Sequence, residues 1–298
     1  MKKVLFVICM LSMGSLAWAQ APSLGTAASF AVLGGTNVTC TGPGVITGDV
    51  GVSPGSAVPF TNTGCAISGG TPPATDAAAA LARTDFLNAY GVLKDPLLTP
   101  CTQTIATNAF TDNVPATLGT VPLGNIPPGV YCFPEAVAFT RTTLTLDGTT
   151  NPNGIWIFKV AAALTGTGLQ VVLANGAQPC NVFWAVDAGA TLTTSTTLPA
   201  LFQGNLLAGD LTGGSITTTG GALVGRALAA VAVTLTGPPA AVNVNGVCAL
   251  VDQAVAQAKA GCKDDDDDRD KDKDKDHHRH HDKDKDKGKD KDEDKDHN

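Results

Sequence analysis

The sequence predicts a mainly β protein in which short strands stack into a β-solenoid, with one long α-helix alongside and a disordered charged tail. Three observations support this fold class. A unit of about 20 residues, typical of solenoids, recurs between residues 154 and 244. A single strong helical pattern covers residues 74–94, and the composition changes abruptly near residue 263.

The recurring unit consists of an apolar run, a corner of small residues and a threonine-rich strand. It occurs as GIWIFKVAAALTGTG (154–168), NVFWAVDAGATLTTST (181–196), GNLLAGDLTGGSITTTG (204–220) and GRALAAVAVTLTG (225–237). One such unit cannot bury its own apolar face, so the units are expected to stack on one another.

The threonine-rich strands predict a flat outer face of hydroxyl and methyl groups with almost no charge. Side chains alternate along a strand, so Thr191 and Thr193 point to one side and Leu192 to the other. Stacking would place equivalent pairs above one another at about 4.7–4.9 Å. The alternative is that threonine reflects only the preference of β-branched residues for strands.

The first 19 residues predict a secretory signal peptide. Lys2 and Lys3 precede an apolar run, and Ala17-Trp18-Ala19 provides a cleavage site between small residues. The run is too short for a comfortable membrane span, and no second stretch of spanning length follows. The mature chain is expected to begin near Gln20 and to be secreted, with the periplasm or cell surface as related destinations.

The body, residues 20–250, begins with strands expected at 30–33, 38–40 and 45–50, separated by Gly and Pro corners. Residues 74–94 follow as a helix capped by Thr75 or Asp76 and ended by Asp95-Pro96. A lone amphipathic helix must pack along something, so it is expected beside the stack as a structural strut. Its apolar stripe contains Ala79, Ala82, Phe86, Ala89 or Tyr90, and Leu93.

The remaining body segments complete the predicted stack. Residues 97–128, rich in Pro and Thr, are expected to cover one end of it. The near-continuous apolar run at 155–160 predicts a buried strand. Residues 251–262 are expected to form a short helix after the body.

The C-terminal tail, residues 263–298, is nearly all Asp, Lys and His. It contains 12 Lys+Arg and 17 Asp+Glu, a net charge of 12 − 17 = −5 within the chain's −7. Such a polyampholyte is too hydrophilic to fold alone and is expected to be disordered. Cell-surface polymers and divalent cations are candidate partners, with His277, His278, His280 and His281 as metal-ligand candidates.

Seven cysteines remain after the leader, and an exported chain is expected to pair them as disulfides. Proximity and position at segment ends favour Cys40–Cys65, Cys101–Cys132 and Cys180–Cys248, although connectivity cannot be deduced from sequence. Cys262 would be free or intermolecular. No CxxC spacing occurs, so a zinc site is not predicted.

The composition of the body excludes several classes of function. The body contains no His, which removes the commonest general base and metal ligand, and no catalytic motif is present. It has no basic patch for nucleic acid. The sequence therefore predicts a non-enzyme without cofactor, metal site in the body or nucleic-acid partner.

The chain resembles the bacterial and fungal ice-binding protein family, built on a discontinuous β-solenoid with a flanking helix. The resemblance covers about residues 23–250. It rests on LGTAASFAVLGG (24–35), VITGDVGVSPGSAV (45–58), IPPGVYCF (126–133), LTLDGTTNPNGIWIFKV (144–160), VVLANGAQPCNVFWAVDAGATL (171–192), GNLLA (204–208) and GRALA (225–229).

This resemblance implies a triangular solenoid and an ice-binding surface on one flat face of a monomer, with ice or ordered water as partner. The candidate residues are Thr165, Thr167, Thr191, Thr193, Thr217, Thr234 and Thr236, followed by Ser215 and Thr219. Gly237-Pro238-Pro239 ends the last strand early and leaves the C-terminal edge of this face undefined. The alternative function is an extracellular adhesin or structural surface module of the same fold without ice activity.

Overall fold

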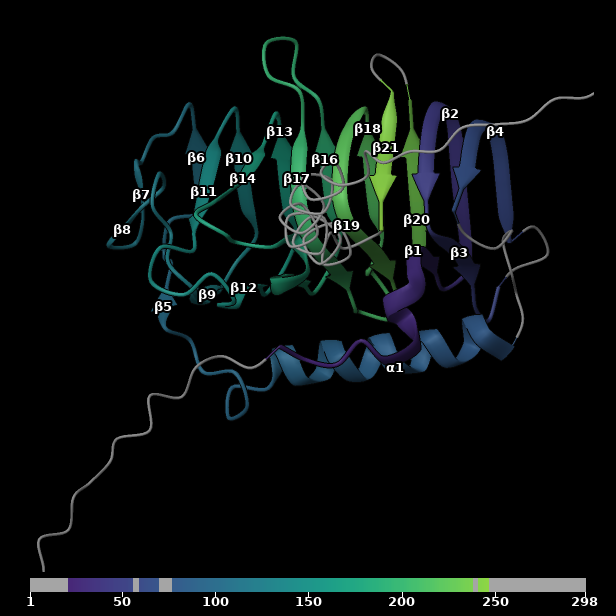
Figure 1. The fold of residues 1–298 in the computed structure, drawn as a ribbon, viewed down its shortest axis with the longest axis horizontal. Helices are drawn as coiled ribbons and strands as arrows, with labels where there is room; N and C mark the ends of the chain where they lie inside the picture. Colours follow the sequence, from purple (N-terminus) through teal and green to yellow (C-terminus); the bar gives the residue numbers. More distant parts are fainter. Residues whose placement is uncertain (1–20, 56–58, 70–76, 238–240, 247–298) are drawn as a thin grey trace, which may run out of the picture. The chain divides into compact units, whose positions relative to one another are not determined.

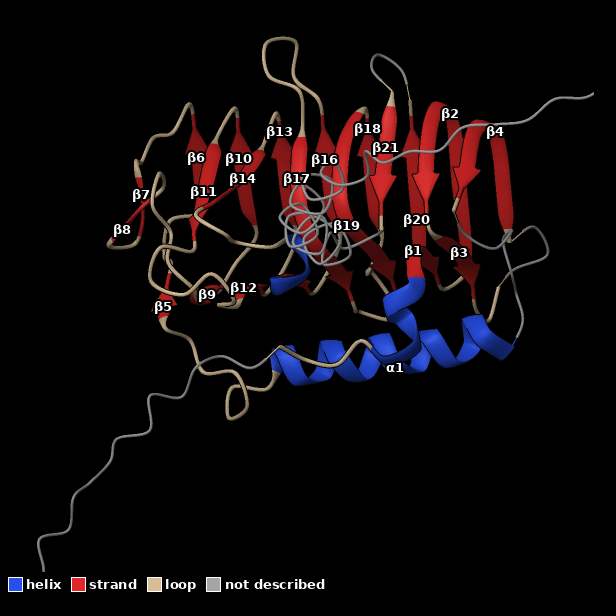
Figure 2. Cartoon of the chain, viewed as in Figure 1, coloured by secondary structure: helices blue, strands red, loops and turns tan. Residues whose placement is uncertain are grey.

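The computed structural model describes residues 21–55, 59–69, 77–237 and 241–246, which form a three-sided solenoid of parallel strands with one long helix beside it (Figures 1 and 2). The predicted leader, the short helix at 251–262 and the charged tail lie outside the described residues. The fold class predicted from the sequence is confirmed for the described part of the chain.

Each side of the solenoid is a ladder of strands in register. The three sides are called the threonine face, the second face and the helix face. The threonine face contains β6 (Ala109–Thr111), β10 (Val137–Thr140), β13 (Leu164–Thr167), β16 (Ala190–Thr193), β18 (Ile216–Thr219), β20 (Ala232–Thr236) and the first halves of β2 (Asn37–Thr47) and β4 (Phe60–Ser68). The second face contains β11 (Thr143–Asp147), β14 (Gln170–Ala174), the first halves of β17 (Leu201–Ala208) and β19 (Gly221–Ala229), β21 (Val242–Asn245), and the second halves of β2 and β4. The helix face contains β5 (Gln103–Thr104), β9 (Gly129–Phe133), β12 (Trp156–Val160), β15 (Val182–Val186), the second halves of β17 and β19, β1 (Phe30–Gly34) and β3 (Asp49–Val52).

The interior of the solenoid is filled by side chains that stack from one coil to the next. Phe158 lies between Tyr131 and Trp184 in the strand register, and its ring stacks on Trp184 with centroids 4.0 Å apart. The apolar run predicted as a buried strand is β12, which is buried along its whole length. Because each coil repeats the same apolar positions, one continuous core runs through the stack.

Glycine allows the chain to turn the corners between faces. In β17 and β19 the corner falls at Gly204 and Gly225, both with φ in the left-handed region. A Cβ on Gly225 would lie 2.0 Å from the carbonyl oxygen of Gly204 in the neighbouring coil. The glycines that open the GNLLA and GRALA repeats are therefore required by both conformation and close backbone approach.

The expected strand at 45–50 is wrong in its bounds. β2 continues from Asn37 to Thr47 through the bend at Gly42-Pro43, and the next strand begins at Asp49. Gly48, with a φ of 121°, turns the chain from the second face to the helix face between them. A corner of this kind interrupts the strand although the apolar pattern continues across it.

The first and last described strands lie side by side in the stack. β2 pairs with both β20 and β21, and β1 pairs with β19, so β1 to β4 extend the solenoid beyond its last described C-terminal coil. Arg226 strengthens this junction, because its Nε donates to the carbonyl of Ala28 at 2.9 Å and its Nη1 to Oδ1 of Asn205 at 2.8 Å. Burial lowers the pKa of this guanidinium. Ala28 belongs to the short 3-10 helix η1 (Gly25–Ser29) that precedes β1.

Helix α1 (Ala77–Lys94) returns the chain along the helix face to the opposite end of the stack (Figure 1). Its 18 residues span about 27 Å, close to the ~29 Å of six strand spacings between β3 and β9. The predicted end before Asp95-Pro96 is confirmed, and the predicted caps Thr75 and Asp76 lie outside the described residues. The predicted stripe is also confirmed, because the buried residues are Ala79, Ala82, Phe86, Ala89 and Leu93.

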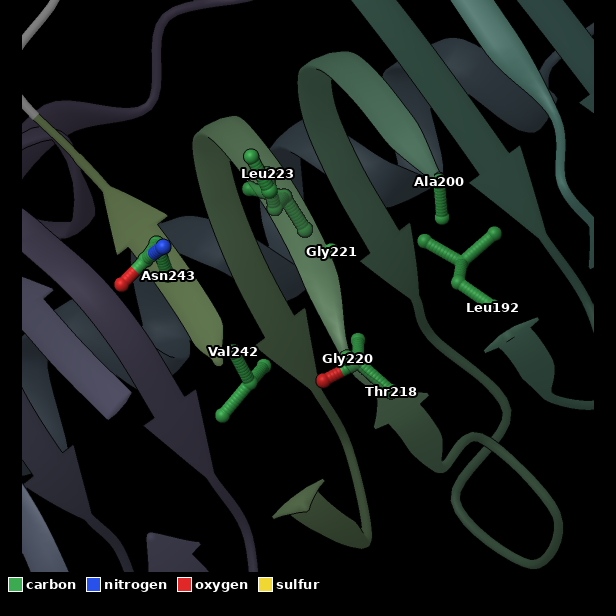
Figure 3. Close-up of a pocket in the computed structure, with 9 residues that line it drawn as sticks. Leu192, Ala200, Thr218, Gly220, Gly221, Leu223, Val242 and Asn243 are labelled. Atoms are coloured by element: carbon green, nitrogen blue, oxygen red, sulfur yellow. The ribbon is translucent and has the colours of Figure 1, made fainter. Parts of the chain in front are cut away.

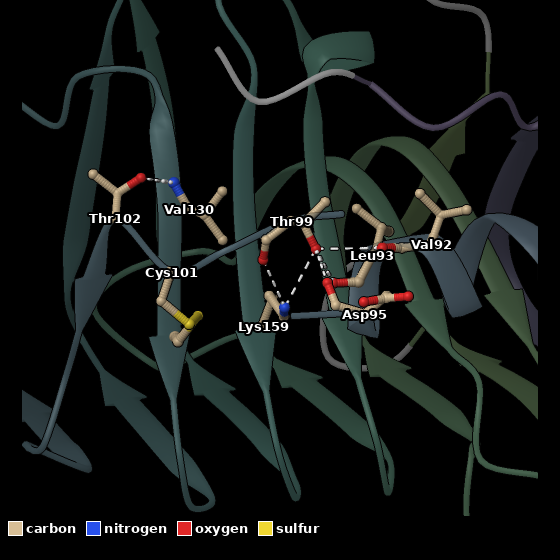
Figure 4. Close-up of a disulfide and its surroundings, with 9 residues drawn as sticks. Val92, Leu93, Asp95, Thr99, Cys101, Thr102, Val130 and Lys159 are labelled. Atoms are coloured by element: carbon tan, nitrogen blue, oxygen red, sulfur yellow. Dashed lines mark hydrogen bonds between the residues drawn. A yellow bond between two sulfur atoms is a disulfide. The ribbon is translucent and has the colours of Figure 1, made fainter. Parts of the chain in front are cut away.

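The C-terminal end of α1 is fixed by polar contacts to the helix face (Figure 4). Thr99 donates from its hydroxyl to the carbonyl of Leu93 at 2.6 Å, and Lys159 on β12 donates to the carbonyl of Thr99 at 2.9 Å. Lys159 is only 7% exposed, and burial, followed by the nearby charge of Lys94, lowers its pKa. Lys94 itself pairs with Asp187 at 2.6 Å.

Two of the three predicted disulfides are present. Cys40–Cys65 joins β2 to β4, and Cys101–Cys132 joins the segment after α1 to β9 (Figure 4). Cys180, in the short 3-10 helix η2 (Pro179–Asn181), is disulfide-bonded. Cys248 lies outside the described residues, so the pairing of these two residues stays a prediction.

The segment after α1 closes one end of the stack, as expected for residues 97–128. It supplies β5 and β6, and then the antiparallel pair β7 (Thr117–Leu118) and β8 (Val121–Pro122). Leu118, Leu123 and Ile126 are buried in the core, and Ile126 bridges to Leu146 of β11. This segment therefore covers the apolar interior beside β6 and β11.

Candidate functional site

The threonine face is the candidate site, and its strand register brings the predicted threonines into two columns. Thr165 is paired with Thr191 and Thr167 with Thr193, and this pairing continues through β18 to β20. Neighbours within a column are separated by the strand spacing of about 4.7–4.9 Å, and the two columns by about 6.6 Å along each strand. The predicted members are Thr165, Thr191, Thr217 and Thr234 in the first column and Thr167, Thr193, Thr219 and Thr236 in the second.

All eight of these threonines point outward. Each is exposed or half-buried, whereas the intervening Leu192, Ile216 and Leu235 are buried. In the described part of the chain, the hydroxyls of the eight make no hydrogen bond to protein and are available to water. Ser215, the remaining predicted residue, directly precedes β18 and is half-buried, outside the two columns.

The columns extend beyond the residues that the sequence analysis selected. Past β20 they continue into β2 and β4, because β2 inserts beside the C-terminal coil. At the other end the second column continues into β10 and β6, while alanines occupy the first. The additional threonines are Thr39 and Thr61 in the first column and Thr41, Thr63, Thr111 and Thr140 in the second.

A sequence signal for these additional residues exists. Val38-Thr39-Cys40-Thr41 has the same pattern as Val233-Thr234-Leu235-Thr236, with which it pairs. Val38 and Val233 are register partners although 233 − 38 = 195 positions separate them in the sequence, so only the fold makes the two segments neighbours. The edge left undefined by Gly237-Pro238-Pro239 is therefore continued by the N-terminal strands.

The threonine face is long, narrow and uncharged. Eight strands at the usual spacing give a length of about 34 Å. None of its described strands contains Asp, Glu, Lys or Arg. An ion pair, Arg141–Asp112, follows directly after β10 and β6, where the guanidinium holds the pKa of Asp112 below its usual range.

The second face has one charged residue in its described strands, Asp147 at the end of β11, and no repeating residue type. Thr143 of β11 is paired with Gln170, and Gln170 with Leu201. Farther along, Asn243 of β21 is paired with Val45 of β2. A regular two-dimensional array of one kind of group therefore occurs on the threonine face and not on the second face.

A small pocket lies where the threonine face turns into the second face (Figure 3). Its cavity volume is about 10 Å³, about the space of a single water molecule and far below the ~300–1,000 Å³ of typical ligand pockets. Leu192, Leu223 and Val242 make its lining largely apolar, and Thr218 contributes a buried hydroxyl without a hydrogen-bond partner in the described residues. Within those residues no three His, Cys, Asp or Glu side chains gather as a metal site, and no helix is long and apolar enough to span a membrane.

The fold and its uncharged threonine array define a class of protein: a discontinuous parallel β-solenoid whose flat face is built from repeated hydroxyl and methyl groups. The sequence matches the Ice-binding-like family over residues 32–239. The chain belongs to this family.

Relatives of known name and structure agree with this assignment. An ice-binding protein of Nostoc sp. (strain HG1) is 39% identical over 207 residues, covering 69% of this chain and 68% of the relative. One of Flavobacterium frigoris (strain PS1) is 33% identical over 217 residues, covering 72% and 73%. The crystal structure of an ice-binding protein from Antarctomyces psychrotrophicus aligns with a TM-score of 0.57 at 27% identity, covering 76% of this chain and 99% of that one.

Proposed function

We propose that this protein binds ice and that the threonine face is the adsorbing surface. The observation that supports the proposal most directly is the register of the threonines. Threonine follows threonine from β13 to β4 in the first column and from β6 to β4 in the second. Relatives named ice-binding proteins share the fold.

The mechanism follows from the rigidity of the array. Each hydroxyl can hold a water molecule at a fixed position, and the neighbouring methyl groups limit the orientations that this water can adopt. The ladder spacing lies near a repeat of the ice lattice, so the ordered water merges with a growing crystal plane. Many weak contacts act together and no residue is a catalyst, which agrees with the absence of His from residues 1–262.

The direct test is a bulky charge in the middle of the array. Thr193→Arg introduces a long cationic side chain between two columns of small groups, and we expect it to remove most of the thermal hysteresis and the faceting of ice crystals. The matched control is Thr145→Arg, which places the same side chain on β11 of the second face. Thr193 and Thr145 are both half-buried in the wild-type protein, so both variants should remain folded as judged by circular dichroism.

The variants test which face binds ice, and the wild-type protein tests whether ice is bound at all. Full hysteresis in Thr193→Arg with loss in Thr145→Arg would move the site to the second face. Round, freely growing crystals with the wild-type protein would reject ice binding and favour the adhesin or structural module of the same fold.

The export of the protein is part of the same proposal. The predicted leader and the disulfides Cys40–Cys65 and Cys101–Cys132 fit an oxidising compartment. The tail is assigned no contact with ice, so removal of residues 263–298 should leave the hysteresis unchanged.

A further inference from the structure

The two ends of the solenoid core are closed to different degrees. At the β6 end Phe110 is 0% exposed, because residues 112–128 cover the interior there. At the β4 end the inward-facing Phe60 and Ile67 are only partly buried. Thr61, Asn62 and Thr63 of β4 are all exposed. Among the described residues, β4 pairs with β2 and with no other strand.

The backbone of β4 has hydrogen-bonding groups directed away from the stack. Val38 is the register partner of Phe60, and its N–H donates to the carbonyl of Pro59 at 2.8 Å. Successive residues of a parallel ladder alternate between the two sides of the strand, so the N–H and C=O of Asn62 face outward. β4 contains no proline and no charged residue. Proline and charged side chains, lysine above all, are the usual means by which an edge strand is protected from pairing.

We propose that β4 pairs with β4 of a second copy of this chain, antiparallel and about a two-fold axis at Asn62. The axis is perpendicular to the threonine face, so both threonine faces point the same way. Thr61 of each copy lies beside Thr63 of the other, as a cross-strand pair of a type that stabilises sheets. The columns then continue from one molecule into the next, and the joint array is twice as long. The pairing replaces the expectation of a monomer and does not rest on ice binding.

The size of the contact makes this association weak. Pairing over the first half of β4, with Phe60 and Ile67 partly covered, buries less than the ~1,000 Å² of a stable interface. The self-complementary edge forms a closed pair and not a filament, because the capped β6 end offers no equivalent strand edge. The dimer is therefore reversible and depends on protein concentration.

The test uses the full-length mature protein and two substitutions at one position. Asn62→Pro removes the outward N–H of residue 62. The pairing of β4 with β2 keeps its N–H donors, because the N–H of Asn62 faces away from β2. Asn62→Ala is the matched control. Both lose the side-chain bonds of Asn62 to the backbone of Cys65, each 2.9 Å, but only the proline variant loses the outward donor.

Sedimentation equilibrium and amide hydrogen exchange provide the readouts. We expect the average mass of the wild type and Asn62→Ala to rise toward that of a dimer with concentration. Asn62→Pro should raise the dissociation constant by about tenfold or more, the equivalent of two lost hydrogen bonds at a symmetric contact. The wild-type Asn62 amide should become protected from exchange only at high concentration.

Three results would overturn the proposal. A wild-type mass that stays monomeric up to millimolar concentration excludes the pair. Equal dimerisation of the proline and alanine variants places the contact elsewhere. An Asn62 amide protected equally at every concentration means that another segment of the same chain covers β4.

Discussion

Thr218 and Thr142 are both buried threonines, but their hydroxyls have different surroundings. The Thr142 hydroxyl donates to the carbonyls of Phe110 and Thr140, at 3.2 and 3.1 Å. The Thr218 hydroxyl has no partner among the described residues. Thr218 also occupies the inward position between Thr217 and Thr219, so a run of three threonines does not mean three surface residues. At the scale of single residues, the side of the strand decides the role.

Replacing each buried threonine by valine should therefore have opposite effects. Thr218→Val removes an unsatisfied buried hydroxyl and should raise the free energy of unfolding by about 1 kcal/mol. Thr142→Val leaves the carbonyls of Phe110 and Thr140 without this donor and should lower it by about 1 kcal/mol. Urea unfolding of both variants measures the difference. Equal destabilisation by both would mean that the Thr218 hydroxyl is satisfied by solvent in the pocket of Figure 3.

Helix α1 connects the two parts of the discontinuous solenoid, because it lies in the sequence between β4 at one end of the stack and β5 at the other. It carries the chain from β4 past the helix face to β5, and it buries one stripe against Leu33, Ile157, Phe183 and Leu207. The helix and its stripe were predictable, because an i, i+3, i+4 pattern is local in sequence. The polar contacts that fix its end, such as Lys159 with Thr99, were not, because their partners are 60 residues apart.

Truncation of the central stripe residue should destabilise the whole solenoid. Phe86 is 0% exposed, so Phe86→Ala should lower the free energy of unfolding by about 3–5 kcal/mol through lost burial and a cavity. Leu81→Ala on the same helix is the control, since Leu81 is 53% exposed and should change stability by less than about 0.5 kcal/mol. Thermal unfolding of the two variants, followed by circular dichroism at a wavelength where β-strands absorb, measures the difference. A transition unchanged by Phe86→Ala would mean that the coils are stable without the helix.

At the scale of the molecule, the charged residues that the structure describes lie away from the strands of the threonine face. Asp147 ends β11 and Asp210 follows β17, and hydrogen bonds from Thr149 and Thr212 lower their pKa values. Asp85 on α1 is likewise lowered by hydrogen bonds from Thr26. Each carboxylate thus supports the fold in its ionised form, while the surface proposed to bind ice contains no titrating group in its described strands.

Stability and ice activity should therefore respond differently to pH. A carboxyl group with a depressed folded pKa stabilises the fold above its unfolded pKa of about 3.9, and this contribution is lost as the pH falls through the folded value. The melting temperature should be flat between about pH 5 and 8 and should fall below about pH 4. Thermal hysteresis should be constant between about pH 5 and 9. A step in hysteresis near pH 6.5, where histidine titrates, would contradict this and implicate the tail.

The sequence alone was sufficient for the patterns that are local along the chain. These include the repeated coil, the alternation that separates Thr191 and Thr193 from Leu192, the helix with its buried stripe, and the composition that leaves the body without His. Each depends on the period of one strand or helix, which the sequence displays directly. Family resemblance added the three-sided solenoid.

Only the tertiary structure decided which strands are neighbours. β2 beside β20 joins residues from opposite ends of the body, and this pairing adds Thr39, Thr41, Thr61 and Thr63 to the array. It also leaves β4 as an exposed edge, while residues 112–128 cover the other end. The order of coils in a stack depends on contacts between segments remote in sequence, and no local periodicity contains that information.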